Sequence, residues 1–459
     1  MLPRALLLGV ALASTACPTD KPVLPSPPAA THSTPDPTSG STGTSSGSSS
    51  GTLDGSTSSA TDPTSTTDEP GSSSGEPPPA CTLPEDRCAA PTTAWWDEKW
   101  SYRRRVTLES PLATALTDAV VPVRLGADFE FACAQDGGDD LRFVDDDDAV
   151  LPHELDQWQP GEGAVAWVRV STLPAMDQEP QALWLYYGNP RAPMPAGEVW
   201  PSSLGLQAVL HLGGDLEDAR GVHPGRPAVD GAIPQFVSDG VMGDAVHYEN
   251  ILVNARAELE GSSFIDDALE ASDALTMTAW VRSTPAVASS TENRTVIGRG
   301  ELGWGMLVRD VGGTDFLPPA YAAFFSHCGD AVCSGLFPND NHLFTGSVPI
   351  IDAPVIPTWH HVGMVYESID GVDYAKRIYV DGVLDEEYIG PLPLPTPTDA
   401  LPITIGAGAG PAGASMTMFH GEIDEVHLAS EAWGPDRIAA EHAFAADPRR
   451  VTVASAECQ

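Results

Sequence analysis

The sequence predicts an all-β protein, and three features lead to this prediction. Glycine and proline occur 43 times each and interrupt the apolar residues often, which favours short strands joined by turns over long helices. Many segments alternate apolar and polar residues with the period of a half-buried strand. The chain has 459 residues, enough for two or three folded domains. We therefore expect two antiparallel β-sandwiches.

Changes in composition divide the chain into five parts. Residues 18–80 are dominated by Ser, Thr, Gly, Pro and Asp. Such a segment cannot bury enough apolar surface to offset the entropy of ordering it, so we expect a disordered tether. The other predicted parts are a signal peptide at 1–17, a first sandwich at 81–200, a second sandwich at 206–445 and a C-terminal tail at 446–459.

The charge of the chain narrows the choice of partners. The 64 acidic residues outnumber the 23 basic ones, and the formal net charge is −41. Phosphate backbones and anionic lipid surfaces repel such a protein, so nucleic acid is not an expected partner. Two interpretations of the carboxylates stay open: most are solvated surface groups, or some bind Ca²⁺.

The N-terminus has the features of a short export signal. Arg4 gives it a positive start, residues 5–13 form an apolar run too short to span a bilayer, and small residues precede Cys17. The stretch Ser14-Thr15-Ala16-Cys17 resembles the lipobox of bacterial lipoproteins, in which the cysteine is lipidated. A lipobox usually has Leu where this chain has Ser14, so an ordinary secretory signal stays the alternative. We expect a bacterial envelope protein, anchored at the outer membrane or cell surface through Cys17, or else a secreted one.

The cysteines support export. Lipidation of Cys17 leaves an even number, and an exported protein can form disulfides. Six cysteines allow 15 pairings, which the sequence does not distinguish. Proximity favours pairing Cys81 with Cys88 and Cys328 with Cys333, which leaves Cys133 for Cys458. The spacing does not support a zinc site.

The first sandwich has strand-like segments separated by turn-forming residues. Asp145 to Asp148 are expected to form a solvated turn, because catalysis by carboxylates needs two of them in different environments at a fixed separation. Several landmarks from Trp95 to Trp200 resemble the bacterial domain of unknown function 2341, a family without an agreed reaction or ligand. These landmarks lie at Trp95–Arg103, Gly138–Val144, Leu151–Leu155, Trp167–Val170 and Leu185–Asn189.

The second sandwich has its own set of strand-like segments. Asp381-Gly382 between apolar residues predicts a tight hairpin, and the residues from Pro435 to Phe444 predict a short closing helix. The order of landmarks between Leu206 and Phe444 resembles the laminin G-like branch of concanavalin A-like jelly rolls. These landmarks are Leu210–Leu212, Gly240–Tyr248, Thr278–Val281, Trp359–Val362, Tyr379–Gly382 and Gly421–Val426.

The laminin G-like resemblance implies a calcium site and a range of ligands. Similar domains use residues at the positions of Asp218 and Asp424 to clamp the two chain ends with Ca²⁺, together with backbone carbonyls near Gly240. The alternative is that Asp218 caps a turn and Asp424 bonds neighbouring backbone. Family members bind sugars, glycosaminoglycans or proteins, or accompany enzymes.

One motif favours an enzyme. Gly421-Glu-Ile-Asp-Glu425 resembles the catalytic strand of laminarinase-type glucanases, and Glu422 and Asp424 share one face of a strand. The third carboxylate of that pattern is missing, because Val426 and His427 occupy its position. We therefore expect a structural role for this motif. Trp280 and Trp359 are expected to fill the sandwich, and the irregular stretch Asp310 to Pro357 is the expected ligand rim.

Three hypotheses of function follow. The first is a binding protein, without an enzymatic activity, that recognises glycan or an extracellular protein through the second sandwich. The second is a glycoside hydrolase or polysaccharide lyase that uses carboxylates of this sandwich. The third is a structural spacer of the envelope. The sequence contains no complete catalytic constellation, so binding is the leading hypothesis.

Overall fold

The computed structural model describes the folded part of the chain. The described residues are 81–228, 233–249, 255–284, 293–300, 303–310, 320–327, 341–351, 357–395, 401–409 and 415–459. Residues 76–459 form one compact unit. It consists of two antiparallel β-sandwiches, which confirms the predicted all-β class. None of the helices in these ranges combines the length and apolar character needed to cross a bilayer.

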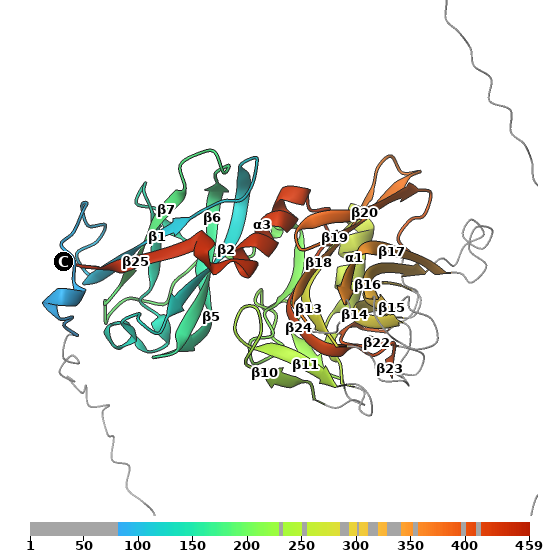
Figure 1. Cartoon of the computed structure of the whole chain (residues 1–459), viewed down its shortest axis with the longest axis horizontal. Coiled ribbons are helices and arrows are strands. Elements are labelled where there is room, and N and C mark those ends of the chain that lie inside the picture. The colour runs from blue at the N-terminus through green and yellow to red at the C-terminus, as the bar shows by residue number, and fades with distance from the viewer. Residues whose placement is uncertain are drawn as a thin grey trace, which may run out of the picture. The chain divides into compact units, whose positions relative to one another are not determined.

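The N-terminal sandwich packs a five-stranded sheet on a three-stranded one (Figure 1). The strand orders are β25-β1-β7-β3-β4 and β2-β6-β5. Strands alternate as the sequence predicts: Val121, Val123 and Leu125 point into the core, whereas Val120, which precedes them, packs on the opposite side. The bounds are β1 Tyr102–Leu108, β2 Leu116–Gly126, β3 Arg142–Asp145, β4 Val150–Leu151, β5 His153–Gln159, β6 Gly163–Leu173, β7 Gln181–Tyr187 and β25 Val451–Cys458, with short 3₁₀ helices at Glu85–Arg87, Phe131–Cys133 and Asp136–Gly138.

The C-terminal residues are not a tail, contrary to the sequence-based prediction. They form β25, which pairs with β1 from Tyr102 opposite Cys458 to Leu108 opposite Val451. Figure 1 shows this strand, in red, beside the blue-green strands of the N-terminal sandwich. The first sandwich is therefore built from residues 81–200 together with the last strand of the chain.

The disulfides also differ from the predicted pairing. Cys81 pairs with Cys133, and Cys88 pairs with Cys458 over a separation of 370 residues. The predicted pairs Cys81–Cys88 and Cys133–Cys458 are therefore wrong. Proximity in sequence misleads here because β25 returns to the start of the folded region. Cys328 and Cys333 lie outside the described residues, as does Cys17.

The C-terminal sandwich is a jelly roll of a seven-stranded sheet and an eight-stranded sheet. The orders are β17-β16-β15-β14-β21-β12-β9 and β10-β11-β24-β13-β18-β19-β20, and β8 also pairs with β24. The bounds are β8 Leu206–Leu210, β9 Gly225–Pro227, β10 Gln235–Val237, β11 Ala245–Glu249, β12 Ala257–Leu259, β13 Ala274–Ser283, β14 Asn293–Arg299, β15 Trp304–Asp310, β16 Ala320–His327, β17 Asn341–Ile351, β18 His360–Ser368, β19 Tyr374–Val380, β20 Val383–Gly390, β21 Ile403–Ile405, β22 Gly408–Ala409, β23 Ser415–Met416 and β24 His420–Ala429. Its helices are α1 Ser262–Ser272 and α3 Pro435–Ala446, with 3₁₀ helices at Ser202–Leu204 and Pro448–Arg450.

Local predictions in this sandwich hold in part. Asp381 and Gly382 form the hairpin turn between β19 and β20, both at the positive φ that such a turn requires. The closing helix is α3, which begins at Pro435 as predicted. The stretch from Asp310 to Pro357 is less irregular than predicted, because β16 and β17 lie within it.

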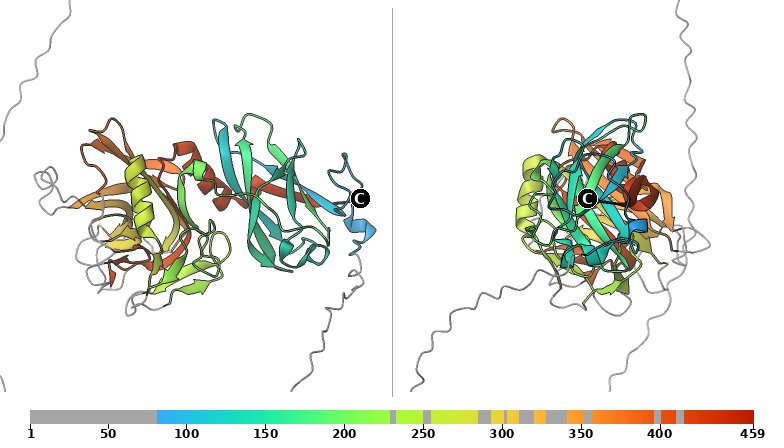
Figure 2. Two further views of the ribbon diagram at one scale, coloured as in Figure 1. Left: turned by 180° about the vertical axis from the view of Figure 1, so that it is seen from behind. Right: turned by 90° about the vertical axis from the view of Figure 1, so that its left-hand side faces the viewer.

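Helix α3 lies between the two sandwiches and contributes to the core of the N-terminal sandwich and to a hydrophobic cluster between the two sandwiches (Figure 2). Phe444 packs into the N-terminal sandwich, whereas Ile438 packs in a cluster that also contains Trp167 and Trp280. Backbone groups reinforce the contact: Arg124 of β2 donates to the carbonyl of Ala445 at 2.8 Å. The outer face of the eight-stranded sheet is thereby covered where β24, β13 and β18 run.

Candidate functional site

Asp218 has the structural role that the sequence left as the alternative to calcium binding. It is 4% exposed. Its two carboxylate oxygens accept four backbone N–H groups at 2.9–3.2 Å, from Val209, Arg220, Val222 and His223. These donors hold the loop after β8 in place.

Asp424 is held in a similar way on β24. Its Oδ2 accepts the N–H groups of Val241 and Met242, and its Oδ1 accepts that of Glu425. Burial raises the pKa of Asp424 well above its ordinary value, and the neighbouring Glu425 adds to this. Gly240 lies beside Asp424. A Cβ added at Gly240 would come within 2.8 Å of Asp424 Oδ2.

These residues do not fit a calcium clamp. Ca²⁺ takes six to eight oxygen ligands, whereas the oxygens of Asp218 and Asp424 already point at backbone N–H donors. An N–H group that points toward a carboxylate oxygen occupies the side from which a cation would approach. Asp218 and Asp424 bond different loops, which gives each of them a separate structural task.

The carboxylates of the glucanase-like motif are also engaged. Glu422 accepts a bond from Arg282 Nε at 2.9 Å and faces His247 Nδ1 at 2.8 Å. Asp424 bonds backbone as described. Neither group is arranged as a free acid or nucleophile.

A surface patch surrounds Glu422, and we call it the Trp359 patch: His247, Arg282, Trp359, Glu422 and Asp239. Trp359 is partly exposed, and its indole N–H donates to the carbonyl of Asp239 at 3.2 Å. The Arg282 guanidinium lies 4.9 Å from the Trp359 ring and pairs with the Asp239 carboxylate at 2.9 Å. The predicted role of Trp359 as filling of the sandwich is therefore wrong, because its ring packs at the surface of the sheet.

Trp280 is buried, but not inside the jelly roll. Its ring stacks on His442 of α3 at 5.4 Å between centroids and lies 5.3 Å from His361. It therefore packs on the outer face of the sheet, beneath α3, and belongs to the contact between the two sandwiches.

A second candidate site lies at the junction of the two sandwiches, and we call it the junction cluster: Glu154, Asp156, His211 and Glu425. His211 follows β8 and is 8% exposed. Its Nδ1 lies 2.8 Å from Glu425 Oε2, and its Nε2 lies 2.8 Å from Glu154 Oε1 of β5. The imidazole stacks on Trp167 with an interplanar angle of 15°. One histidine thus connects carboxylates of both sandwiches.

The charges of the junction cluster shift the pKa values of its members. Burial alone would lower the pKa of His211, but Glu425 and Glu154 raise it well above its ordinary value. Burial raises the pKa of Asp156 to about 7. For Glu425, burial acts to raise the pKa, but the contact with His211 lowers it overall.

The backbone at Glu425 is unusual for a strand. Its φ is +48°, in the left-handed region that side chains other than glycine seldom adopt. The register between β13 and β24 shifts at this point, between Thr278 and Trp280, which marks a bulge. A bulge changes the direction of a side chain, and here it allows Glu425 to reach His211 while Val426 remains in the core.

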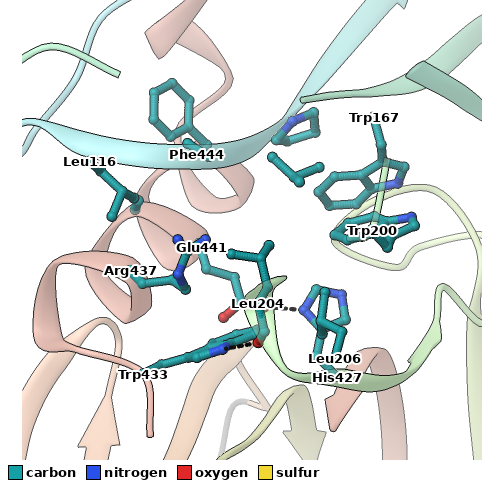
Figure 3. Close-up of a pocket in the computed structure, with 14 residues that line it drawn as sticks. Leu116, Trp167, Trp200, Leu204, Leu206, His427, Trp433, Arg437, Glu441 and Phe444 are labelled. Carbon is teal, nitrogen blue, oxygen red and sulfur yellow. Dashed lines mark hydrogen bonds and ion pairs between the residues drawn. The ribbon is translucent and has the colours of Figure 1, made fainter. Parts of the chain in front are cut away.

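A second ion pair lies next to the junction cluster and lines a narrow pocket (Figure 3). His427 Nδ1 contacts Glu441 Oε1 of α3, and His427 Nε2 lies 3.7 Å from Glu425 Oε2. Burial alone would lower the pKa of His427, but Glu441 and Glu425 raise it to about 9. Burial would raise the pKa of Glu441, but His427 and His361 lower it overall.

Sequence reasoning did not bring the junction cluster together. In the sequence, Glu154 falls within the landmark Leu151–Leu155, His211 within the landmark Leu210–Leu212, and Glu425 at the end of the glucanase-like motif. His211 and Glu425 are 214 positions apart, and His211 and Glu154 are 57 apart. No short-range spacing signals such contacts, and a left-handed residue within a strand has no sequence signature.

Comparison with known families confirms the two resemblances and their order. Residues 137–198 match the model of a domain of unknown function, DUF2341. Residues 343–439 match the laminin G model of the concanavalin A-like lectin/glucanases superfamily. The chain is therefore similar to an N-terminal DUF2341 module followed by a laminin G-like module. No curated protein matches the chain.

Solved structures resemble the chain over about half of its length. The botulinum neurotoxin type G receptor binding domain is 13% identical, with 52% of this chain and 51% of that chain covered and a TM-score of 0.35. The binding domain of paraclostridial mosquitocidal protein 1 is 11% identical, with 52% of each chain covered and a TM-score of 0.35. Domain 4 of the Geobacillus stearothermophilus arabinanase AbnA, solved with arabinotriose, is 18% identical, with 51% of this chain and 96% of that chain covered and a TM-score of 0.33. The chain thus spans about half the length of the two toxin domains.

Proposed function

We propose that this protein is a surface-attached binding protein whose jelly roll recognises glycan through the Trp359 patch. The observation that carries the proposal is a partly exposed Trp359 ring beside charged hydrogen-bonding groups on the outer face of a rigid sheet. An aromatic face packs against the C–H groups of a sugar ring, and neighbouring polar groups bond its hydroxyls. The match of residues 343–439 to a superfamily of lectins and glucanases supports the same class of ligand.

Binding fits the patch better than hydrolysis does. A glycosidase needs one carboxyl group that can donate a proton and a second that acts as a base or nucleophile. Glu422 is held by Arg282 and His247, and Asp424 by backbone N–H groups. These contacts engage both groups, so neither is placed as a free proton donor or nucleophile for a bound sugar.

A glycan array probed with the purified chain, with and without Ca²⁺, tests the proposal. We expect binding to at least one glycan class, and the substitution Trp359→Ala should weaken it at least about tenfold, the loss typical of a central aromatic contact. Phe264→Ala is the matched control, because Phe264 is 68% exposed on α1 and lies outside the patch. Glycan cleavage would show an enzyme instead. If the protein binds none of the glycans, or if Trp359→Ala binds them as tightly as wild type, the proposal is contradicted. Either result would favour a protein ligand or a structural spacer.

We further propose that Cys17 is lipidated and holds the protein at the bacterial envelope. The proposal rests on the lipobox-like residues before Cys17 and on the Ser-, Gly- and Pro-rich composition of residues 18–80. Several acyl chains on one cysteine anchor a protein firmly, whereas one short chain binds only marginally. The substitution Cys17→Ser should therefore move the protein from the membrane fraction to the soluble fraction. Unchanged fractionation would contradict the anchor without bearing on glycan binding.

A further inference from the structure

The junction cluster gathers metal-ligating atoms from both sandwiches. One ligand atom each of Asp156, His211 and Glu425 lies within 4.8 Å of the other two. Asp156 comes from β5 of the N-terminal sandwich, whereas His211 and Glu425 belong to the jelly roll. Within the described ranges, no other group of three or more such residues is this close.

Two carboxylate oxygens in this cluster have no hydrogen-bond partner among the described residues. They are Glu425 Oε1 and Asp156 Oδ2, and both atoms are buried. Glu425 as a residue is only 3% exposed. A buried carboxylate oxygen without a donor is costly, and such atoms are usually satisfied by a partner or by an ion.

The charge around His211 is negative overall. Glu154, Asp156 and Glu425 converge on one imidazole, which supplies a single positive charge when protonated. The guanidinium of Arg124 is near Glu425, but it donates hydrogen bonds to the carbonyls of Val241, Phe444 and Ala445 and to the sulfur of Met242. Asp424 is also close, and His427 is shared with Glu441. A divalent cation would balance this excess.

A neighbouring cleft and the local backbone geometry agree with an ion site. The cleft is lined by His153, Glu154, Trp200 and Arg220, and its lining residue Glu154 bonds His211 directly. The left-handed φ of Glu425 and the bulge around it hold this carboxylate away from the regular strand direction. Outliers of this kind concentrate at functional sites.

We propose that Asp156, His211 and Glu425 bind one divalent transition-metal ion of the Zn²⁺ class, which links the two sandwiches. One imidazole nitrogen with carboxylate oxygens is a ligand set of such ions, whereas Ca²⁺ prefers oxygen ligands alone and more of them. On binding, His211 releases one ring proton to solvent and becomes a neutral ligand. The site is separate from the Trp359 patch and does not depend on glycan binding.

The test uses the purified exported chain without a polyhistidine tag, treated with chelator and then titrated with Zn²⁺, Co²⁺ or Ca²⁺. We expect one Zn²⁺ or Co²⁺ per chain, a visible absorption band of bound Co²⁺, and a rise in melting temperature with Zn²⁺. Asp156→Asn and Glu425→Gln should each weaken Zn²⁺ binding at least about tenfold and remove the melting shift. The control Asp147→Asn changes an exposed turn and should leave both intact.

Asp156→Asn keeps the test decisive even where Glu425→Gln does not fold, because Asp156 lies at the edge of the cluster and is only half-buried. Three results would overturn the proposal: a wild-type chain that binds neither Zn²⁺ nor Co²⁺, an Asp156→Asn chain that binds them as tightly as wild type, or Ca²⁺ that displaces Zn²⁺ at equal concentration. The last result would return the site to the oxygen-ligated class.

Discussion

Deleting residues 451–459 is expected to unfold the N-terminal sandwich. The deletion removes β25, the disulfide Cys88–Cys458 and the carboxylate of Glu457, which pairs with the fully buried Arg103. A native disulfide contributes about 2–5 kcal/mol, and a buried charge without its partner costs about 3–5 kcal/mol. Together these losses approach the whole stability of a domain, about 5–15 kcal/mol.

Calorimetry and hydrogen exchange measure this effect. The truncated chain should lose protection in β1 and β7, while β13 and β18 of the jelly roll retain theirs, because their partners are unchanged. A chain that lacks residues 18–75 is the matched control for a shortened terminus. Full protection of β1 after removal of β25 would contradict the role we give to this strand.

Glu441→Gln is expected to destabilise the folded unit by about 3 kcal/mol or more at pH 7, because it leaves the buried His427 without its carboxylate partner. Chemical denaturation measures the change in the free energy of unfolding. Glu431→Gln is the matched control, because Glu431 is an exposed glutamate shortly before α3. The double variant with His427→Gln should recover part of the loss, since neither charge then remains alone.

The His427–Glu441 pair should also make the free energy of unfolding depend on pH. The pKa of His427 is raised from 6.5 to about 9, so its stabilising contribution is complete below pH 6.5 and is lost as the pH rises through 9. This shift corresponds to about 3 kcal/mol. The pKa of Glu441 is lowered, so its contribution is lost as the pH falls below 4.5. Wild type should lose stability between pH 6.5 and 9, and Glu441→Gln should lose much less; equal slopes would contradict this assignment.

Local sequence patterns predicted most of the fold because they report on local physics. The alternation in β2 and β6, the Asp381-Gly382 turn and the proline at the start of α3 each depend on neighbouring residues only. The run from Asp145 to Asp148 is a turn as predicted, in which Asp145 Oδ1 accepts the N–H groups of Asp147 and Ala149. Such features need no knowledge of distant segments.

The errors come from contacts between distant segments. Residues 446–459 are short and polar enough to suggest a tail, and nothing near them indicates that β1 has a free edge for β25. The predicted disulfide pairing is wrong for the same reason, because the pairing of β25 with β1 brings Cys458 to Cys88. At the site, the sequence left two roles open for Asp218 and Asp424, a calcium clamp or bonds to backbone, because their donors lie in loops whose direction the sequence does not reveal.

The late return of β25 affects how the nascent chain completes its fold. Strand β1 is synthesised early, but its edge partner follows only after the entire jelly roll, and pairing across so large a loop is slow. During this interval Cys81 and Cys88 are near each other in sequence, whereas the native partner of Cys88 has not yet been synthesised. A disulfide isomerase that reopens a premature Cys81–Cys88 bond would therefore speed folding. Loss of the free thiol of Cys458 would mark the point at which the native Cys88–Cys458 disulfide has formed.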